Sequence, residues 1–166
     1  PASLAMLNTT IVRFVDGLMV SWVSPVAVSA QFFAGITGFV PESFMLGTLS
    51  VVSTYVSQNL GARRYGRCAQ YAWAGLVLAF AFAALLAPLA LAAGPLFRLL
   101  GHKEWALEAM YFRYMILAVS MTLGARVLEQ FFYGVHRPRV VLWVSLGAAA
   151  FNIAANYVLI FGHLGF

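Results

Sequence analysis

The sequence predicts an all-α polytopic membrane protein, a bundle of about five long hydrophobic helices. Hydrophobic residues make up 63% of the 166-residue chain and charged residues 9%, with a mean hydropathy of +0.88. A soluble domain is about 45–50% apolar and about 25% charged. Polar groups could not cover this much apolar surface, so lipid is the solvent that fits. The apolar runs are continuous, whereas strands of a transmembrane barrel are short and alternate in polarity.

The first two runs are each long enough to cross a bilayer, which takes about 20 helical residues. The first covers about residues 1–23 and ends at Ser24-Pro25, a turn signal. The second covers about 27–58 and stops at the polar and glycine-containing segment 59–64. The chain starts with Pro1 in place of Met. We therefore expect both ends to be cut from a longer protein.

Three more runs follow, each closed by glycine, proline or charged residues. We expect helices over about 68–91, 107–133 and 140–161, with breaks at Gly94-Pro95, at 134–139 and at Gly162. No low-complexity linker divides the chain, so residues 1–166 are predicted to be one domain or part of one.

Loop charges predict the orientation. Arg63, Arg64 and Arg67 follow the second run, and Arg137 and Arg139 follow the fourth, with no acid in either loop. Short loops rich in Lys and Arg lie in the cytoplasm. We therefore expect a multi-pass protein of the cell inner membrane, with a cytoplasmic N-terminus. The opposite side carries three basic residues and two acids, namely Arg98, Lys103, Arg113, Glu104 and Glu108.

Several function classes are excluded by missing patterns. The basic residues form no continuous stripe of the kind that binds nucleic acid. The three histidines and the single Cys68 are too dispersed for a metal centre. No phosphate loop, dinucleotide fingerprint or nucleophile elbow is present, so we expect neither an enzyme nor a bound cofactor.

Apart from the charges assigned above to the loops and the two membrane faces, five charged residues lie inside the hydrophobic spans: Arg13, Asp16, Glu42, Arg126 and Glu129. Each costs at least ~2.5–3.5 kcal/mol at a helix centre, so such residues normally face a bundle interior or a wet cavity. Arg13 and Asp16 are three positions apart, as are Arg126 and Glu129. This spacing allows an ion pair on one helix face. One interpretation is therefore that both pairs are salt bridges with a structural role only. This interpretation suits Arg126 and Glu129 better than it suits Asp16.

The fifth span supplies the reason to single out Asp16. Asn152 and Asn156 lie one turn apart on one helix face. Their carbonyl oxygens, with a carboxylate from another helix, could ligate a hard cation such as Na+. The carboxylate could instead carry a proton, because burial favours the neutral acid. By their spacing alone, the two amides fit ordinary interhelical hydrogen bonding better than an ion site.

Glu42 follows Pro41 in the middle of the second span. Proline removes a backbone hydrogen bond and can kink a helix. A carboxyl beside a kink is typical of a binding or gating position, and equally of a neutral acid bonded to the freed carbonyl groups. Glu42, Arg13 and Glu129 are therefore secondary candidates for a cavity or gate.

Several segments resemble the multidrug and toxic compound extrusion (MATE) family. Residues 14–20 (FVDGLMV) look like its first-helix signature, residues 52–63 (VSTYVSQNLGAR) like the end of its second helix and the following loop, and residues 152–162 (NIAANYVLIFG) like the end of its fifth. They occur in the family's order and cover nearly the whole chain. A small-residue segment, 25–30, resembles the entry to the second helix.

The resemblance implies helices 1–5 of the N-terminal lobe of a twelve-helix, two-lobe transporter, without helices 6–12. Such proteins export cationic, amphipathic compounds in exchange for Na+ or H+. Asp16 would be the cation-coupling carboxylate, and Asn152 and Asn156 would share its cavity. Some members carry an acid where this sequence has Asn156. Arg13, Glu42 and Arg126 match no family signature.

Two other functions stay open at this stage. A flippase for a lipid-linked saccharide would need a more cationic cavity, which Arg13 and Arg126 favour and Asp16 does not. A membrane scaffold without transport activity would use its salt bridges for packing alone. For the main hypothesis, the expected partners are the lipid bilayer, a cationic small molecule and the missing helices. We expect the fragment alone not to transport.

Overall fold

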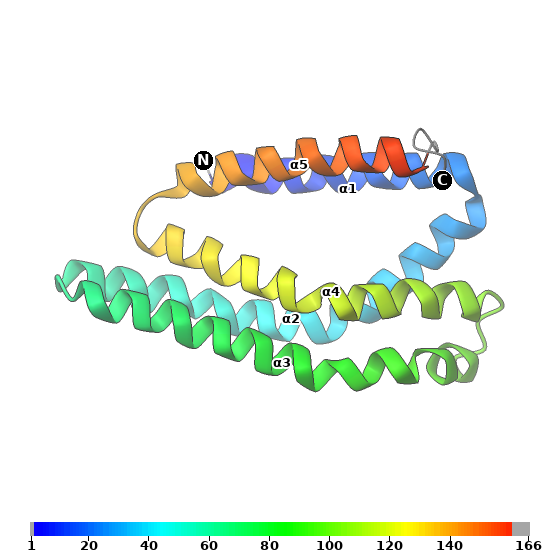
Figure 1. Cartoon of the computed structure of the whole chain (residues 1–166), viewed down its shortest axis with the longest axis horizontal. Helices are drawn as coiled ribbons and strands as arrows, with labels where there is room; N and C mark the ends of the chain where they lie inside the picture. The colour runs from blue at the N-terminus through cyan, green and yellow to red at the C-terminus, as the bar shows by residue number, and fades with distance from the viewer. Residues whose placement is uncertain (1, 161–166) are drawn as a thin grey trace. The chain divides into compact units, whose positions relative to one another are not determined.

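The computed structural model describes residues 2–160, without the side chains of residues 2–6, 9, 23 and 160. This part of the chain is helical, with no strand, and the all-α prediction is confirmed. Figure 1 shows the five helices, which are α1 (Ala2–Val23), α2 (Pro25–Gly61), α3 (Tyr65–Leu99), α4 (Trp105–Gly134) and α5 (Pro138–Ile160).

The predicted break at Gly94-Pro95 is wrong, because α3 continues to Leu99. A proline inside a helix removes one backbone donor and leaves the other hydrogen bonds of the turn in place. Nε of Arg113 in α4 donates a hydrogen bond of 3.1 Å to the carbonyl of Ala90, more than one turn before Pro95. The expected end of the last helix, at Phe161 and Gly162, lies outside the described residues.

Four helices are long and apolar enough to cross a membrane when the described residues are considered: α2, α3, α4 and α5. Many of their large apolar side chains point outward, as in Phe44, Leu85, Met121 and Phe151. Outward apolar surface of this extent suits contact with lipid or with further helices. The chain is therefore a multi-pass membrane protein.

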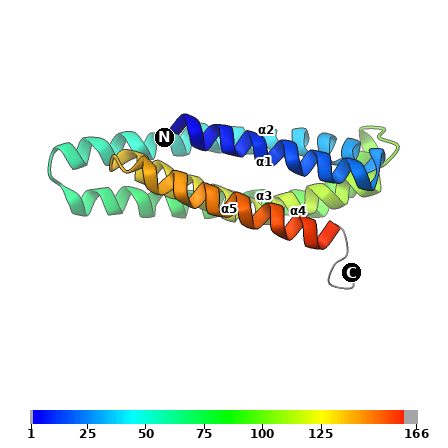
Figure 2. The same ribbon diagram turned by 90° about the horizontal axis from the view of Figure 1, so that it is seen from above.

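The helices form two compact groups, which are described separately. The first consists of α1, the start of α2 and α5, and the second of α2 from Ala30 on, α3 and α4. In the second group, the turn after Gly61 reverses the chain, so that α3 runs back beside α2 (Figure 2).

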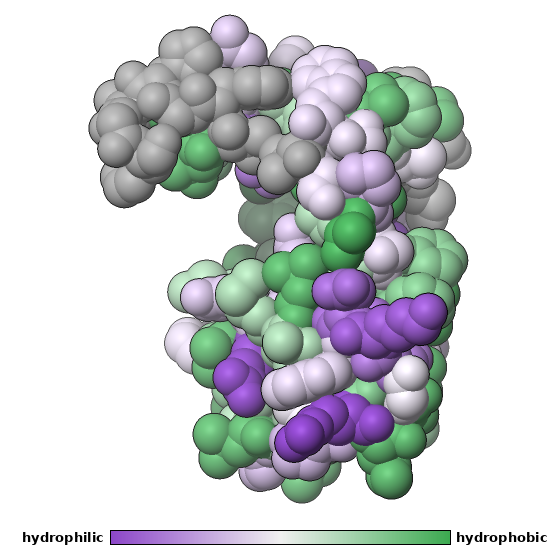
Figure 3. Space-filling view, turned by 90° about the vertical axis from the view of Figure 1, so that its right-hand side faces the viewer, coloured by the Kyte–Doolittle hydropathy of each residue, from purple (hydrophilic) through white to green (hydrophobic). Residues whose placement is uncertain are grey.

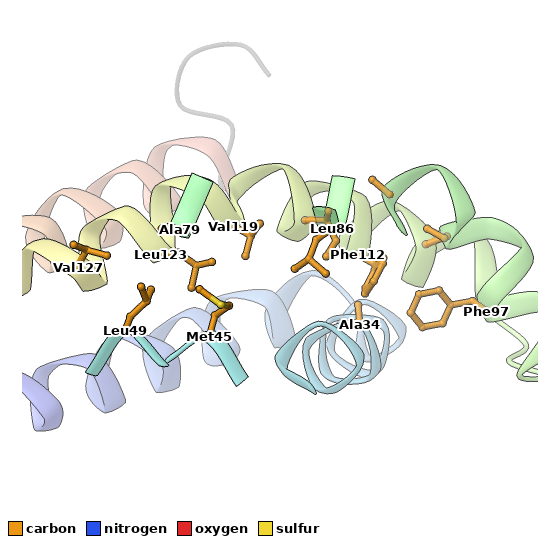
Figure 4. Packing of buried hydrophobic residues seen from close by; sticks show 14 residues of the cluster. Ala34, Met45, Leu49, Ala79, Leu86, Phe97, Phe112, Val119, Leu123 and Val127 are labelled. Carbon is orange, nitrogen blue, oxygen red and sulfur yellow. The ribbon is translucent and has the colours of Figure 1, made fainter. Parts of the chain in front are cut away.

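The core of the second group lies between α2, α3 and α4. Figure 4 shows Met45 and Leu49 of α2 facing Leu123 and Val127 of α4, and these four side chains are almost fully buried. On α2 the buried positions continue at spacings of three, four or seven on both sides of Pro41. One helix face therefore stays in the core despite the proline.

Glycines allow these helices to approach closely. A Cβ on Gly134 would lie 2.7 Å from Cβ of Val56 and 2.8 Å from the Ser53 carbonyl oxygen. A Cβ on Gly75 would lie 2.9 Å from a methyl group of Val127. Small residues at such crossings are typical of membrane helix bundles, because packing replaces the hydrophobic effect there.

The α3–α4 end of the second group contains a buried acid, Glu108, which the sequence analysis counted among the charges of the side opposite the basic loops. Glu108 lies in the first turn of α4 and is 3% exposed. Its Oε2 is 2.5 Å from Nδ1 of His102. The imidazole also makes edge contacts with Phe33 of α2 and Phe97 of α3. His102 thus contacts all three helices of the group, at the end that Figure 3 views, where hydrophilic and apolar surfaces mix.

Candidate ion-binding site in α1 and α5

Helices α1 and α5 lie side by side and run in the same direction (Figure 1). Nδ2 of Asn8 donates to the Ser145 carbonyl over 2.9 Å, and further along both helices Asn156 contacts Asp16. The covered positions of α1 include Asn8, Val12, Asp16 and Met19, spaced by four or three. This is one face of a helix, and it places Asp16 toward α5.

Asp16, Asn152 and Asn156 form one hydrogen-bonded cluster. Nδ2 of Asn156 donates to Oδ1 of Asp16 over 2.7 Å and to Oδ1 of Asn152 over 3.2 Å. All three side chains are half-buried. An amide group carries two N–H donors, so both donors of Asn156 are used here.

The cluster concentrates oxygen atoms around one negative charge. The second carboxylate oxygen of Asp16 and the carbonyl oxygen of Asn156 make no bond in this cluster, and each keeps its acceptor capacity. Oxygen ligands with few charges are what a hard cation prefers. The arrangement can hold a small cation, or a proton on the carboxylate.

Arg13 does not form the ion pair that its spacing allows. Among the described residues no salt bridge joins it to Asp16, and its side chain is exposed while that of Asp16 is half-buried. Three positions correspond to about 300° around a helix, so Arg13 lies about 60° off the face that meets α5. Asp16 is therefore bonded to a neutral amide, and its charge is not neutralised by Arg13.

The other candidates lie in the second group of helices. Nη1 of Arg126 is 2.7 Å from Oε2 of Glu129, so the ion pair predicted for these two residues forms. Glu42 is half-buried beside Pro41 within an unbroken α2. In the described part of the chain it makes no side-chain hydrogen bond or ion pair.

Sequence reasoning missed two polar contacts. Asn8 pairs with a backbone carbonyl, which leaves no signal in the partner's side chain. Glu108 was counted among the charges of the side opposite the basic loops, whereas the structure buries it in the first turn of α4 against His102.

Comparison with known proteins identifies the family and relatives of the chain. The MatE family model matches residues 1–158. The chain is 30% identical to a probable multidrug resistance protein NorM of Bradyrhizobium diazoefficiens, with 99% of this chain and 36% of the relative covered. It is 31% identical to a probable NorM of Rhizobium meliloti, with 99% and 35% covered. It is 27% identical to the multidrug resistance protein NorM of Burkholderia vietnamiensis, with 99% and 36% covered.

The chain thus spans about a third of the length of these relatives. No solved structure matches it significantly. The match to the family model covers all five helices up to the last residues of α5, including Asp16, Asn152 and Asn156. The chain therefore belongs to the MatE family, whose members are transporters and not enzymes.

Proposed function

We propose that the chain is the first part of a secondary antiporter that exports cationic, amphipathic compounds in exchange for Na+ or H+. The observation that carries the proposal is the bond from Asn156 to Asp16, which gives an acid in an apolar helix a neutral partner on a second helix. An acid kept only for packing would be matched by a cation, as Glu129 is by Arg126. The relatives named for multidrug resistance support export of drug-like compounds.

In the proposed site, the coupling ion competes with the amide of Asn156. That amide stands between Oδ1 of Asp16 and Oδ1 of Asn152, where its two hydrogens serve two acceptors. A Na+ ion there would need oxygen ligands, so the amide would turn to present its carbonyl oxygen. A proton on Asp16 would instead remove the charge that attracts the N–H group. Either event changes the bonds that tie α1 to α5, and can therefore favour one helix arrangement over another.

The remaining helices would complete the transport path. We assign the chain to helices 1–5 of the N-terminal lobe in the cell inner membrane, with the N-terminus in the cytoplasm. The loop charges support this orientation. Glu42, half-buried and without a described partner, is a secondary candidate for attracting a cationic substrate. Arg13 and Glu129 are weaker candidates, because one is exposed and the other is paired.

The full-length protein in proteoliposomes tests the function. Vesicles loaded with a cationic dye, such as ethidium, would be given an inward Na+ gradient, an inward H+ gradient or neither. The proposal predicts dye efflux under one of the two gradients and not without one. Absence of gradient-driven efflux under both conditions, with correctly inserted protein, would overturn it. Movement of a lipid-linked saccharide in that preparation would favour the flippase.

A further inference from the structure

The turn between α2 and α3 carries an unpaired positive cluster, which does not depend on the transport proposal. Arg63, Arg64 and Arg67 are all exposed. Within the described part of the chain, none of their guanidinium groups has a hydrogen bond or ion pair. The sequence holds no acid between Glu42 and Glu104. The acid in the C-terminal part of α4, Glu129, is already paired with Arg126.

The backbone of the turn is unusual at Arg63. Arg63 adopts a left-handed conformation, with φ of 58°. Glycine adopts this conformation without the steric clash of a Cβ, and it is the ordinary residue there. The turn therefore keeps an arginine where glycine would fit its backbone better. His136, in the turn between α4 and α5, has the same φ of 58°.

A pocket lies next to the cluster, at the start of α3. It is open, with a volume of about 350 Å³, and is lined by Arg67, Gln70, Tyr71 and Ala74. The first three side chains each carry a hydrogen-bond donor, and Arg67 adds a full positive charge. Tyr71 is held in place by stacking on Tyr55 of α2, with ring centroids 4.9 Å apart and planes inclined by 8°. Such a donor set fits a phosphate group.

The helix face beyond the pocket is apolar. Trp73, Val77 and Phe80 are 69%, 66% and 55% exposed. They follow Gln70 at spacings of three or four, so they lie on one face of α3 that leads away from the pocket. A polar, cationic end joined to an apolar stripe matches the two parts of a phospholipid.

We propose that the α2–α3 turn binds the headgroup of an anionic glycerophospholipid, with its phosphate among Arg63, Arg67, Gln70 and Tyr71 and an acyl chain along Trp73, Val77 and Phe80. Basic residues at the end of a membrane helix attract anionic lipids. A free phosphate ion would use the headgroup site alone. The apolar stripe therefore favours a lipid.

Native mass spectrometry of the full-length protein, titrated with phosphatidylglycerol or phosphatidylcholine, tests the proposal. Arg67→Gln should raise the dissociation constant of the phosphatidylglycerol adduct about five-fold. Arg139→Gln makes the same charge change in the other basic segment. It should change the dissociation constant of the phosphatidylglycerol adduct less than about two-fold. Equal weakening by both variants, or equal binding of the two lipids by the unmodified protein, would overturn the site.

Arg63→Gly separates lipid binding from folding. It removes the charge and gives the turn the residue that its φ favours. We expect unchanged or higher thermal stability together with weaker phosphatidylglycerol binding. Inorganic phosphate in large excess should not displace the lipid. Displacement by phosphate, or full lipid binding in both Arg63→Gly and Arg67→Gln, would contradict the proposal.

Discussion

Asp16 of α1 and Asn156 of α5 are 140 positions apart in the chain and are joined by a hydrogen bond of 2.7 Å. The bond connects a carboxylate to an uncharged amide, although Arg13 lies three residues away on the same helix. An arginine partner would fill the acceptor sites of the acid and cancel its charge. The amide fills one acceptor site and leaves the charge in place for a cation.

Asn156 should contribute more to the stability of the α1–α5 pair than Asn152 does. Asn156→Ala removes both donors of the cluster and leaves the Asp16 carboxylate without its partner, at a cost of about 1–3 kcal/mol. Asn152→Ala removes one acceptor only, at a cost of about 0.5–1.5 kcal/mol. Unfolding of the full-length protein in detergent measures both variants. Equal stability losses would mean that the bond to Asp16 contributes little.

Gly134 should tolerate no side chain. A methyl group there would meet Val56 and the Ser53 carbonyl at under 3.0 Å, and overpacking of this kind costs about 1–3 kcal/mol. Gly147→Ala in α5 is the matched control, because its added Cβ has no neighbour within 4 Å. That control should be neutral or should gain up to about 1 kcal/mol from helix propensity. Midpoints of thermal unfolding compare the two, and a neutral Gly134→Ala would show that α2 and α4 can separate at no cost.

His102 should be needed because it satisfies a buried carboxyl group. His102→Ala leaves Glu108, which is 3% exposed, without its hydrogen-bond partner, and should cost about 1–3 kcal/mol. Glu108→Gln in the same protein replaces the buried charge by a neutral amide and should recover part of that loss. Chemical unfolding of the single and double variants forms the thermodynamic cycle. Additive losses would exclude coupling between the two residues.

The sequence predicted more of the helices than of their contacts. The lengths of the apolar runs were enough to locate five helices, because the thickness of the bilayer sets the minimum length of a spanning helix. The break at Gly94-Pro95 was a wrong prediction, since local turn signals do not include the packing of this segment, where Gly94 and Phe97 are buried.

The contact between Asp16 and α5 followed from an acid and two amides in apolar spans, together with the family resemblance. The spacing of Arg13 and Asp16 allowed an ion pair. The structure shows instead that Asp16 lies on the face of α1 that meets α5, whereas Arg13 is exposed. The contact that Asn8 makes depends on the relative register of α1 and α5. The contact that His102 makes depends on the path of the loop before α4. Neither follows from the periodicity of a single segment.

The most direct test of the coupling role of Asp16 is dye efflux by Asp16→Asn in the full-length protein, reconstituted in proteoliposomes and driven by the gradient that drives the unmodified protein. Asparagine keeps the size of the side chain, so the variant should insert normally and lose ion-driven efflux. Arg13→Gln changes a charge on the same helix and should keep efflux within about two-fold, because Arg13 forms no ion pair with Asp16 among the described residues. Efflux by Asp16→Asn at the unmodified rate would contradict the account.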